Sequence, residues 1–442
     1  MELNLLFAVF AGIAILLTLI LYFRIQAFIA LLISSISVGL IAGMPPLEII
    51  QTIQKGMAST LGFVAIVVGL GSIFGAILEQ SGGANVLASY LVKKFGEKHA
   101  SWAMVIAGFF IAIPVFFDVG FIILVPIVYA LQRKTKKSLL LYALPLLSGL
   151  AITHAFIPPT PGPIAVADIL GADLGWVILF GVIAGIPAAI VSGPLFAKFI
   201  SRKIHISAPE TFTEIKSQSE PPTVGLIFSI IGLPILLIVL GTLTKNQSAL
   251  PEFVALLFTL LGHPFTALIL ANLIAWYALG IRKGYTKSQL QDISTKSLAP
   301  AGIIILLTGA GGVFKQMLVD TGTGEMLASY FAEAGINVFI FAFIAAGLVR
   351  VLQGSATVAM ITAAGITAPL LPESLSDPIK AMLVIAIAGG ASMFSHVNDS
   401  GFWLVGNYLG LSEKQTFQSW TALTTLLAFV GFITIFVLQF FF

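Results

Sequence analysis

The sequence predicts an all-α protein that crosses a membrane many times and consists of two related halves inserted with opposite topology. Three observations support this prediction. Only 9% of the 442 residues are charged and 58% are hydrophobic, whereas a soluble domain carries charge on roughly a quarter of its residues. Apolar stretches recur at the length of about 20 residues that a helix needs to cross a bilayer. Finally, a segment of the first half is repeated in the second.

The apolar stretches are expected to be helices, because they lack the short alternation of polar and apolar residues that is typical of a membrane β-barrel. No basic region precedes the first stretch, so we interpret it as a retained span rather than a cleaved signal. Clear spans are 3–22, 174–197, 222–243 and 414–440, and the stretch 253–280 is also expected to cross the membrane.

The repeat joins GLGSIFGAILEQSGGANVLASYL (69–91) to GAGGVFKQMLVDTGTGEMLASYF (309–331), which align without gaps. Further along, GLAITHAFIPPTPGP (149–163) and GGASMFSHVNDSG (389–401) place a polar, helix-breaking stretch at equivalent points of the two copies. We therefore divide the chain into an N-terminal repeat, a cytoplasmic linker and a C-terminal repeat, at 1–197, 198–221 and 222–442.

Loop charge indicates the orientation of the first half, because Lys and Arg collect on the cytoplasmic side. Basic residues flank the segment 100–131 on both sides, so both of its ends are expected in the cytoplasm. Its middle, IPVFFDVGF, contains a proline and an acidic residue that interrupt a helix. We therefore predict a re-entrant hairpin over about 100–131 that turns at Pro114–Gly120, followed by a broken helix over about 138–170.

The corresponding segment of the second half is 337–371, and its flanks are acidic. This charge pattern indicates the external side, so we predict a second hairpin there and a second broken helix over about 379–410. The basic loops 198–203 and 282–296 are expected inside. The prediction amounts to about ten spans plus two hairpins, with both termini outside.

Inverted repeats with broken helices near the bilayer midplane are typical of secondary transporters. A helix that begins inside the membrane exposes free N–H groups, which attract an anion. We expect four such breaks to converge: at Asp118, at Pro158–Pro163, at Gly354–Thr357 and in the stretch that contains Asp399. A charged side chain at the bilayer centre costs at least ~2.5–3.5 kcal/mol, so those retained there are functional candidates.

The charged and titratable candidates each allow two interpretations. Arg350 could pair with a substrate carboxylate through two hydrogen bonds, or it could only pair with a nearby carboxylate of the protein or snorkel toward the membrane surface. Asp118 and Asp399 suit sugar hydroxyls or a proton, although Asp118 could instead cap a helix. His154 and His396 could titrate near neutral pH or make structural hydrogen bonds. With the hydroxyls of Ser355 and Thr357 at the second tip, this pattern is typical of a small hydroxylated anion moving with a proton.

The motifs FFDVG (116–120), THAFIPPTPGP (153–163), QGSATVA (353–359) and SHVNDSGFW (395–403) together resemble the gluconate:proton symporter (GntP) family of bacterial permeases. The resemblance covers nearly the whole chain. It implies import of gluconate or a related sugar acid with a proton, while some relatives take other small hydroxy acids or D-serine. It also implies the inverted-repeat architecture of the broader ion transporter superfamily. Gluconate members often carry Glu where this chain has Asp118 and His where it has Thr160, so the resemblance indicates the mechanism more closely than the substrate.

The resemblance also implies which residues line the substrate route: Asp118, His154, Thr160, Gly162, Ser355, Thr357, Ser395, His396, Asn398 and Asp399. Arg350 and Gly354 join them as substrate-binding candidates. We expect the substrate carboxylate at the Gly354–Thr357 tip and its hydroxyls at Asn398, Asp399 and Thr160. The candidates for carrying the proton are Asp118, His154, His396 and Asp399.

The expected setting is the cytoplasmic (inner) membrane of a bacterium, with a small carboxylate and H⁺ as partners; whether the chain is a monomer or a homodimer stays open. Without cysteines, disulfides and thiolate metal sites are excluded, and we expect no metal, no cofactor and no nucleic-acid partner. A sodium-coupled organic anion transporter is the closest alternative, because small-residue tips with free carbonyls could hold Na⁺. A channel fits a duplicated scaffold with breaks in both halves less well. An intramembrane hydrolase is least favoured, since neither HExxH nor GxSxG occurs, and we expect no enzyme activity.

Overall fold

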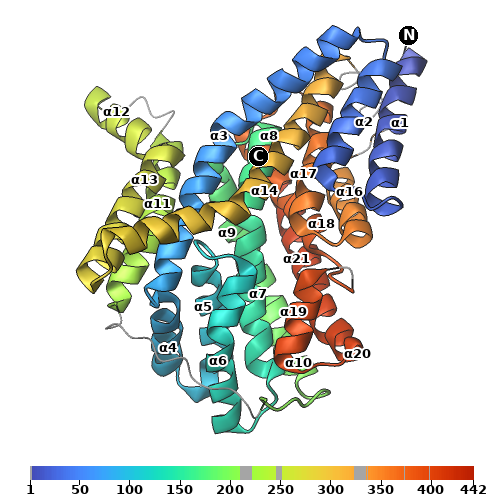
Figure 1. The fold of residues 1–442 in the computed structure, drawn as a ribbon. Coiled ribbons are helices and arrows are strands. Elements are labelled where there is room, and N and C mark those ends of the chain that lie inside the picture. Colours follow the sequence, from blue (N-terminus) through green and yellow to red (C-terminus); the bar gives the residue numbers. More distant parts are fainter. Residues whose placement is uncertain are drawn as a thin grey trace.

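The computed structural model describes residues 2–209, 222–244, 251–322, 335, 337–372, 374–397 and 399–442. Within these ranges every regular element is a helix (Figure 1). In chain order the main helices are α1 (Glu2–Leu21), α2 (Ala27–Ile41), α3 (Pro46–Gln80), α4 (Gly83–Phe95), α5 (Ala100–Ile111), α6 (Phe117–Thr135), α7 (Leu140–Phe156), α8 (Pro161–Leu170), α9 (Leu174–Ile190), α10 (Phe196–Ile200), α11 (Val224–Thr244), α12 (Glu252–Leu261), α13 (Pro264–Ala275), α14 (Lys287–Asp320), α16 (Val338–Gln353), α17 (Ala356–Thr367), α18 (Asp377–Ser392), α19 (Ser400–Leu409), α20 (Glu413–Thr416) and α21 (Ala422–Leu438).

The all-helical, multi-pass prediction is confirmed. In the described part of the chain, 7 continuous helical stretches are long and apolar enough to cross a membrane: Pro46–Gln80, Leu140–Leu170, Leu174–Ile200, Val224–Thr244, Pro264–Lys283, Lys287–Asp320 and Glu413–Phe441. Shorter apolar helices add α1, α2, α16 and α17. The total of ten spans, the re-entrant hairpins and the inverted orientation of the halves stay predictions.

The long helices α3 and α14 run obliquely through the molecule and pack against each other in opposite directions (Figure 1). Small residues allow this close approach, as is common between membrane helices. A Cβ atom at Gly56 would lie only 2.7 Å from Val313 Cα, and Gly312 leaves room for the side chain of Thr60. At the end of the contact, Thr52 Oγ1 donates to Asp320 Oδ2 over 2.9 Å.

The chain breaks its helices inside all four segments that the sequence singles out. The breaks separate α5 from α6, α7 from α8, α16 from α17 and α18 from α19. Their local causes differ. Pro161 is the first residue of α8, where the missing N–H costs nothing. Gly354 ends α16 in the left-handed conformation with φ 87°, which favours glycine. Ser355 and Asp399 then cap α17 and α19 with their side chains.

Helix α7 holds this region in place because nearly all of its residues are buried. It packs against α5 so closely that a Cβ atom at Gly108 or Gly149 would collide with the backbone of the other helix. Its Ser148 Oγ lies 2.7 Å from Ser192 Oγ in the π-helical turn that joins α9 to α10. The residues near the end of α7 therefore sit on a rigid support.

Two boundaries differ from the sequence prediction. The span expected at 253–280 is divided between α12 and α13 at Gly262 and His263, because Pro264 starts a new helix and the His263 Nδ1 accepts from Phe265 N at 3.3 Å. The basic loop expected at 282–296 is mostly the first part of α14. A capping box between Thr286 and Gln289 starts that helix. The loop was predicted from its basic residues alone, and some of these are accommodated in the first turns of the helix.

The glycine contact predicts a site-specific loss of stability. Gly56→Ala places a methyl group against the backbone of α14, so we expect it to lower the free energy of unfolding by roughly 1–3 kcal/mol. Gly62→Ala is the matched control, since a Cβ atom there meets no atom within 4 Å. Thermal unfolding in detergent measures both, and equal shifts of the two variants would contradict the packing described here.

A candidate anion site at four helix N-termini

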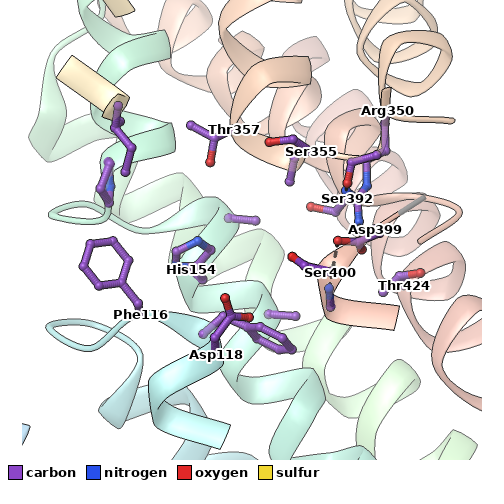
Figure 2. A pocket seen from close by; sticks show the side chains of 18 of the residues that line it. Phe116, Asp118, His154, Arg350, Ser355, Thr357, Ser392, Asp399, Ser400 and Thr424 are labelled. Atoms are coloured by element: carbon purple, nitrogen blue, oxygen red, sulfur yellow. Dashed lines mark hydrogen bonds and ion pairs between the residues drawn. The ribbon is translucent and has the colours of Figure 1, made fainter. Parts of the chain in front are cut away.

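A cavity of about 660 Å³ lies where four helices begin in the protein interior (Figure 2). Its volume is typical of sites for small organic molecules, roughly 300–1,000 Å³. The first residues of α6, α8, α17 and α19 line it, and Pro300 and Ile304 of α14 contribute apolar wall. The predicted convergence of the four breaks is therefore present in the structure.

The four N-termini give the cavity a positive potential without requiring a free cationic side chain. Each helix N-terminus carries an equivalent of about half a positive charge and unsatisfied N–H groups. No side-chain cap bonds the N-terminus of α6 or α8. At α17 and α19 the caps are single contacts, Val358 N to Ser355 Oγ at 3.4 Å and Gly401 N to Asp399 Oδ1 at 3.0 Å. This arrangement suits a carboxylate or another small anion.

Arg350 and Asp399 form a buried ion pair on one side of the cavity (Figure 2). The Arg350 guanidinium also donates to the Gly354 carbonyl, while its Nε has no hydrogen-bond partner among the described residues. Arg350 is only 5% exposed. Burying two charges is costly unless they meet with good geometry and further hydrogen bonds. Of the two interpretations of Arg350, the structure therefore supports pairing with a carboxylate of the protein.

Ser395 lies outside the cavity lining and stabilises the ion pair by a hydrogen bond to Asp399. Its Oγ donates to Asp399 and accepts from Trp420 Nε1 at 2.6 Å, and its backbone N donates to Thr424 Oγ1 at 3.3 Å. The Trp420 indole in turn stacks on Phe117, with ring centroids 5.3 Å apart. This network connects the start of α19 to α21 and to the first turn of α6.

Asp118 and His154 lie on the opposite side of the cavity and have fewer hydrogen-bond partners than Arg350 and Asp399 (Figure 2). Asp118 belongs to the first turn of α6, and its side chain makes no hydrogen bond or ion pair with the part of the chain that the structure describes. The N-cap of α6 is Phe116, so the interpretation of Asp118 as the cap is wrong. His154 Nδ1 is buried and unpartnered among those same residues, and its ring faces Phe116 with centroids 6.1 Å apart.

The structure places the sequence candidates in two groups. Those that line the cavity are Asp118, His154, Arg350, Gly354, Ser355, Thr357 and Asp399. Four others lie outside its lining: Thr160 donates to the Ile157 carbonyl at 2.6 Å, Gly162 packs against Met360, Ser395 lies behind Asp399, and His396 Nε2 lies 2.9 Å from the Val351 carbonyl. Asn398 lies outside the described residues.

Several lining residues were absent from the sequence candidates: Phe116, Pro161, Gln353, Ser392, Ser400, Trp420 and Thr424. Ser400 directly follows Asp399, and Gln353 directly precedes the Gly354 tip, so position next to a break was an available signal. Ser392 and Thr424 lie within apolar helices, and only tertiary packing brings their hydroxyls to the cavity.

Comparison with known proteins identifies relatives along the whole chain. A family model described as GntP family permease matches residues 3–441. A low-affinity gluconate transporter of Escherichia coli (strain K12) is 40% identical over 422 residues, 95% of each chain. A gluconate permease of Pseudomonas aeruginosa is 38% identical over 428 residues, 96% of this chain and 95% of the relative.

A solved structure resembles the fold. The crystal structure of the Alcanivorax borkumensis YdaH transporter superposes with a TM-score of 0.67 at 13% identity, covering 94% of this chain and 98% of that one. At that identity the likeness concerns the fold alone. The sequence relatives are named as transporters and permeases, so the chain is a transport protein and not an enzyme.

The buried ion pair predicts strong coupling between its two residues. Asp399→Asn or Arg350→Gln alone leaves one buried charge uncompensated, and we expect each to cost about 3–5 kcal/mol of stability. The double variant should cost clearly less than the sum of the two. Thermal unfolding of all three measures this, with the exposed pair Asp292–Lys296 as the control, where Asp292→Asn should cost at most about 1 kcal/mol. Additive losses at Arg350 and Asp399 would contradict the pairing.

Proposed function

The chain belongs to the GntP family of permeases, and on this premise we propose that it imports gluconate or a related small hydroxylated carboxylate by proton symport. The proposed location is the cytoplasmic (inner) membrane of a bacterium. The observation that carries the proposal is the cavity at four helix N-termini. Its lining includes the carboxylate of Asp118, which makes no hydrogen bond or ion pair with the described residues.

The substrate carboxylate is proposed to bind at the starts of α8 and α17. Thr357 lines the cavity there, and of the first three residues of α8 only Gly162 has an N–H group, because Pro161 and Pro163 have none. Thr357 makes no hydrogen bond with the described residues, so its hydroxyl is free to donate to a ligand oxygen. A bound carboxylate would gain charge-assisted hydrogen bonds, which are about twice as strong as neutral ones.

The remaining polar groups suit the hydroxyls of a sugar acid. Ser400 presents its hydroxyl at the start of α19, and the Gln353 amide lies at the end of α16. A polyol needs donors and acceptors together, because each buried hydroxyl left unpaired costs free energy. The apolar parts of Phe116 and Trp420 would cover the carbon chain.

Asp118 is the proposed proton acceptor, and His154 of α7 lines the same side of the cavity (Figure 2). When Asp118 is ionised, its carboxylate lines the cavity without a counter-ion among the described residues and would repel an incoming anion. At an effective dielectric constant of 20, two like charges about 4 Å apart repel by about 4 kcal/mol. Protonation removes this repulsion, so a proton and the anion bind more strongly together than apart.

The sequence prediction also named Asp399 and His396 as candidates for carrying the proton. Asp399 is neutralised by Arg350, and the His396 ring bonds the Val351 carbonyl outside the cavity lining. Neither is proposed to exchange the proton. Release to the other side would follow by alternating access, in which the helices that begin at the cavity shift together relative to the rest of the chain.

Proteoliposome uptake tests the proposal. Under an inward proton gradient without sodium, the protein should accumulate radiolabelled gluconate. Asp118→Asn mimics the protonated carboxyl, so we expect it to abolish accumulation driven by the proton gradient while it retains exchange of labelled for unlabelled gluconate. Asp292→Asn, an exposed aspartate of α14, is the matched control and should transport like the unaltered protein.

The outcomes separate the alternatives. Transport of glycerate, galactonate or D-serine in place of gluconate would retain proton coupling and reassign the substrate. Accumulation driven only by a sodium gradient would replace H⁺ with Na⁺ as the coupling ion. Full gradient-driven accumulation by Asp118→Asn would exclude Asp118 as the proton carrier.

A further inference from the structure

A second cavity, of about 540 Å³, shares no lining residue with the first. Its lining residues lie at the starts of α5 and α7, in α10, and in the segments that precede α5 and α7 and flank α10. Its lining is strongly basic and comprises Lys98, Lys136, Lys137, Lys198, Arg202 and His205. One carboxylate, Glu97, also lines it, and Lys134 pairs with Glu97 at 2.8 Å.

The lysines and the arginine of this basic cavity outnumber its one described carboxylate, Glu97, which already pairs with Lys134. Across the described ranges, none of its four lysines and Arg202 makes an ion pair. Ser101 adds a hydroxyl whose oxygen is buried and lacks a hydrogen-bond partner among those residues. A concave site with several free cations and an unpaired hydroxyl is complementary to a phosphate group.

Apolar side chains continue directly from the basic cavity. Leu195, Lys198, Phe199 and Arg202 follow each other at the spacing that places residues on one face of a helix. Leu195 and Phe199 are 52% and 55% exposed. Along the preceding helix α9, Ile183 and Ile186 are also exposed. An apolar stripe therefore leads away from the cations along one helical stretch.

Trp102 provides a third feature. It lines the basic cavity and is 36% exposed, in the first turn of α5. Tryptophan is enriched at the level of lipid headgroups, where its ring contacts both polar and apolar surroundings. Its place at the rim is consistent with a cavity that lies at the membrane surface and opens toward lipid.

From these contacts we propose that the basic cavity binds the phosphodiester headgroup of an anionic phospholipid, whose acyl chains lie along the stripe at Leu195 and Phe199. The basic loops around it are those expected on the cytoplasmic side, and basic pockets between membrane helices on that side suit anionic headgroups. A free phosphate would use the same cations but would leave the apolar stripe unused. The bound lipid would join α5, α7 and α10, because each of them contributes to the cavity wall.

Native mass spectrometry of the detergent-purified protein with added phosphatidylglycerol tests this site, with phosphatidylcholine as the neutral lipid. We expect phosphatidylglycerol to bind preferentially. Lys198→Gln combined with Arg202→Gln should weaken its binding by about tenfold or more, since each basic residue near a membrane surface contributes substantially to anionic-lipid affinity. The matched control, Lys93→Gln with Lys94→Gln, removes the same charge from exposed positions of α4 outside the cavity.

Two results would overturn the proposal. Equal weakening in the Lys93/Lys94 control would show that general surface charge, and not the basic cavity, holds the lipid. If inorganic phosphate at millimolar concentration displaced phosphatidylglycerol completely from the unaltered protein, a free phosphate would be the occupant. Lys136→Gln combined with Lys137→Gln changes a different segment of the cavity wall and should weaken phosphatidylglycerol binding in the same way. Agreement between the two variants would show that the loss does not result from misfolding of the Lys198/Arg202 variant.

Discussion

A polypeptide in lipid must satisfy its backbone hydrogen bonds internally, and the rest of this structure depends on that constraint. A helix that starts inside the membrane cannot leave its first N–H groups in hydrocarbon. Four helices start in the protein interior, and the first residues of all four line one cavity. Concentrating the breaks in one place satisfies the constraint and creates a positive potential in the interior. The rigid helix α7 and the close contact between α3 and α14 hold the surrounding frame.

The two halves satisfy the constraint by different means. In the second half, Arg350, Asp399 and Ser395 tie the ends of α16, α17 and α19 into one hydrogen-bonded network. In the first half the N-termini of α6 and α8 have no side-chain cap, and Asp118 and His154 have unpaired polar atoms among the described residues. One half is thus electrostatically compensated, whereas the other retains groups that can exchange a proton and bind an anion. This difference is why we assign the proton to Asp118.

Much of this arrangement followed from the sequence, because breaks in apolar helices have local causes. Pro114, the Pro158–Pro163 run and Gly354 marked three of them, and scarcity of charge indicated the multi-pass fold. The direction of each side chain at a break could not be predicted, since no helical periodicity applies there. Ser395 and Ser400 flank Asp399 closely, yet one lies behind it and the other faces the cavity. The Thr160 hydroxyl donates to the Ile157 carbonyl and does not line the cavity. The partner of Arg350 lies 49 residues away and becomes evident only in three dimensions.

The central claim is that the substrate anion occupies the cavity at the four helix N-termini, and substrate protection of a single thiol tests it most directly. The chain has no cysteine, so Ser400→Cys introduces a unique reactive group at the start of α19. The account predicts that saturating gluconate slows modification of this thiol by a small charged methanethiosulfonate reagent. Ser207→Cys, on the exposed polar segment after α10, should react at the same rate with and without gluconate. Unchanged reactivity of Ser400→Cys, in a variant that still transports gluconate, would contradict the claim.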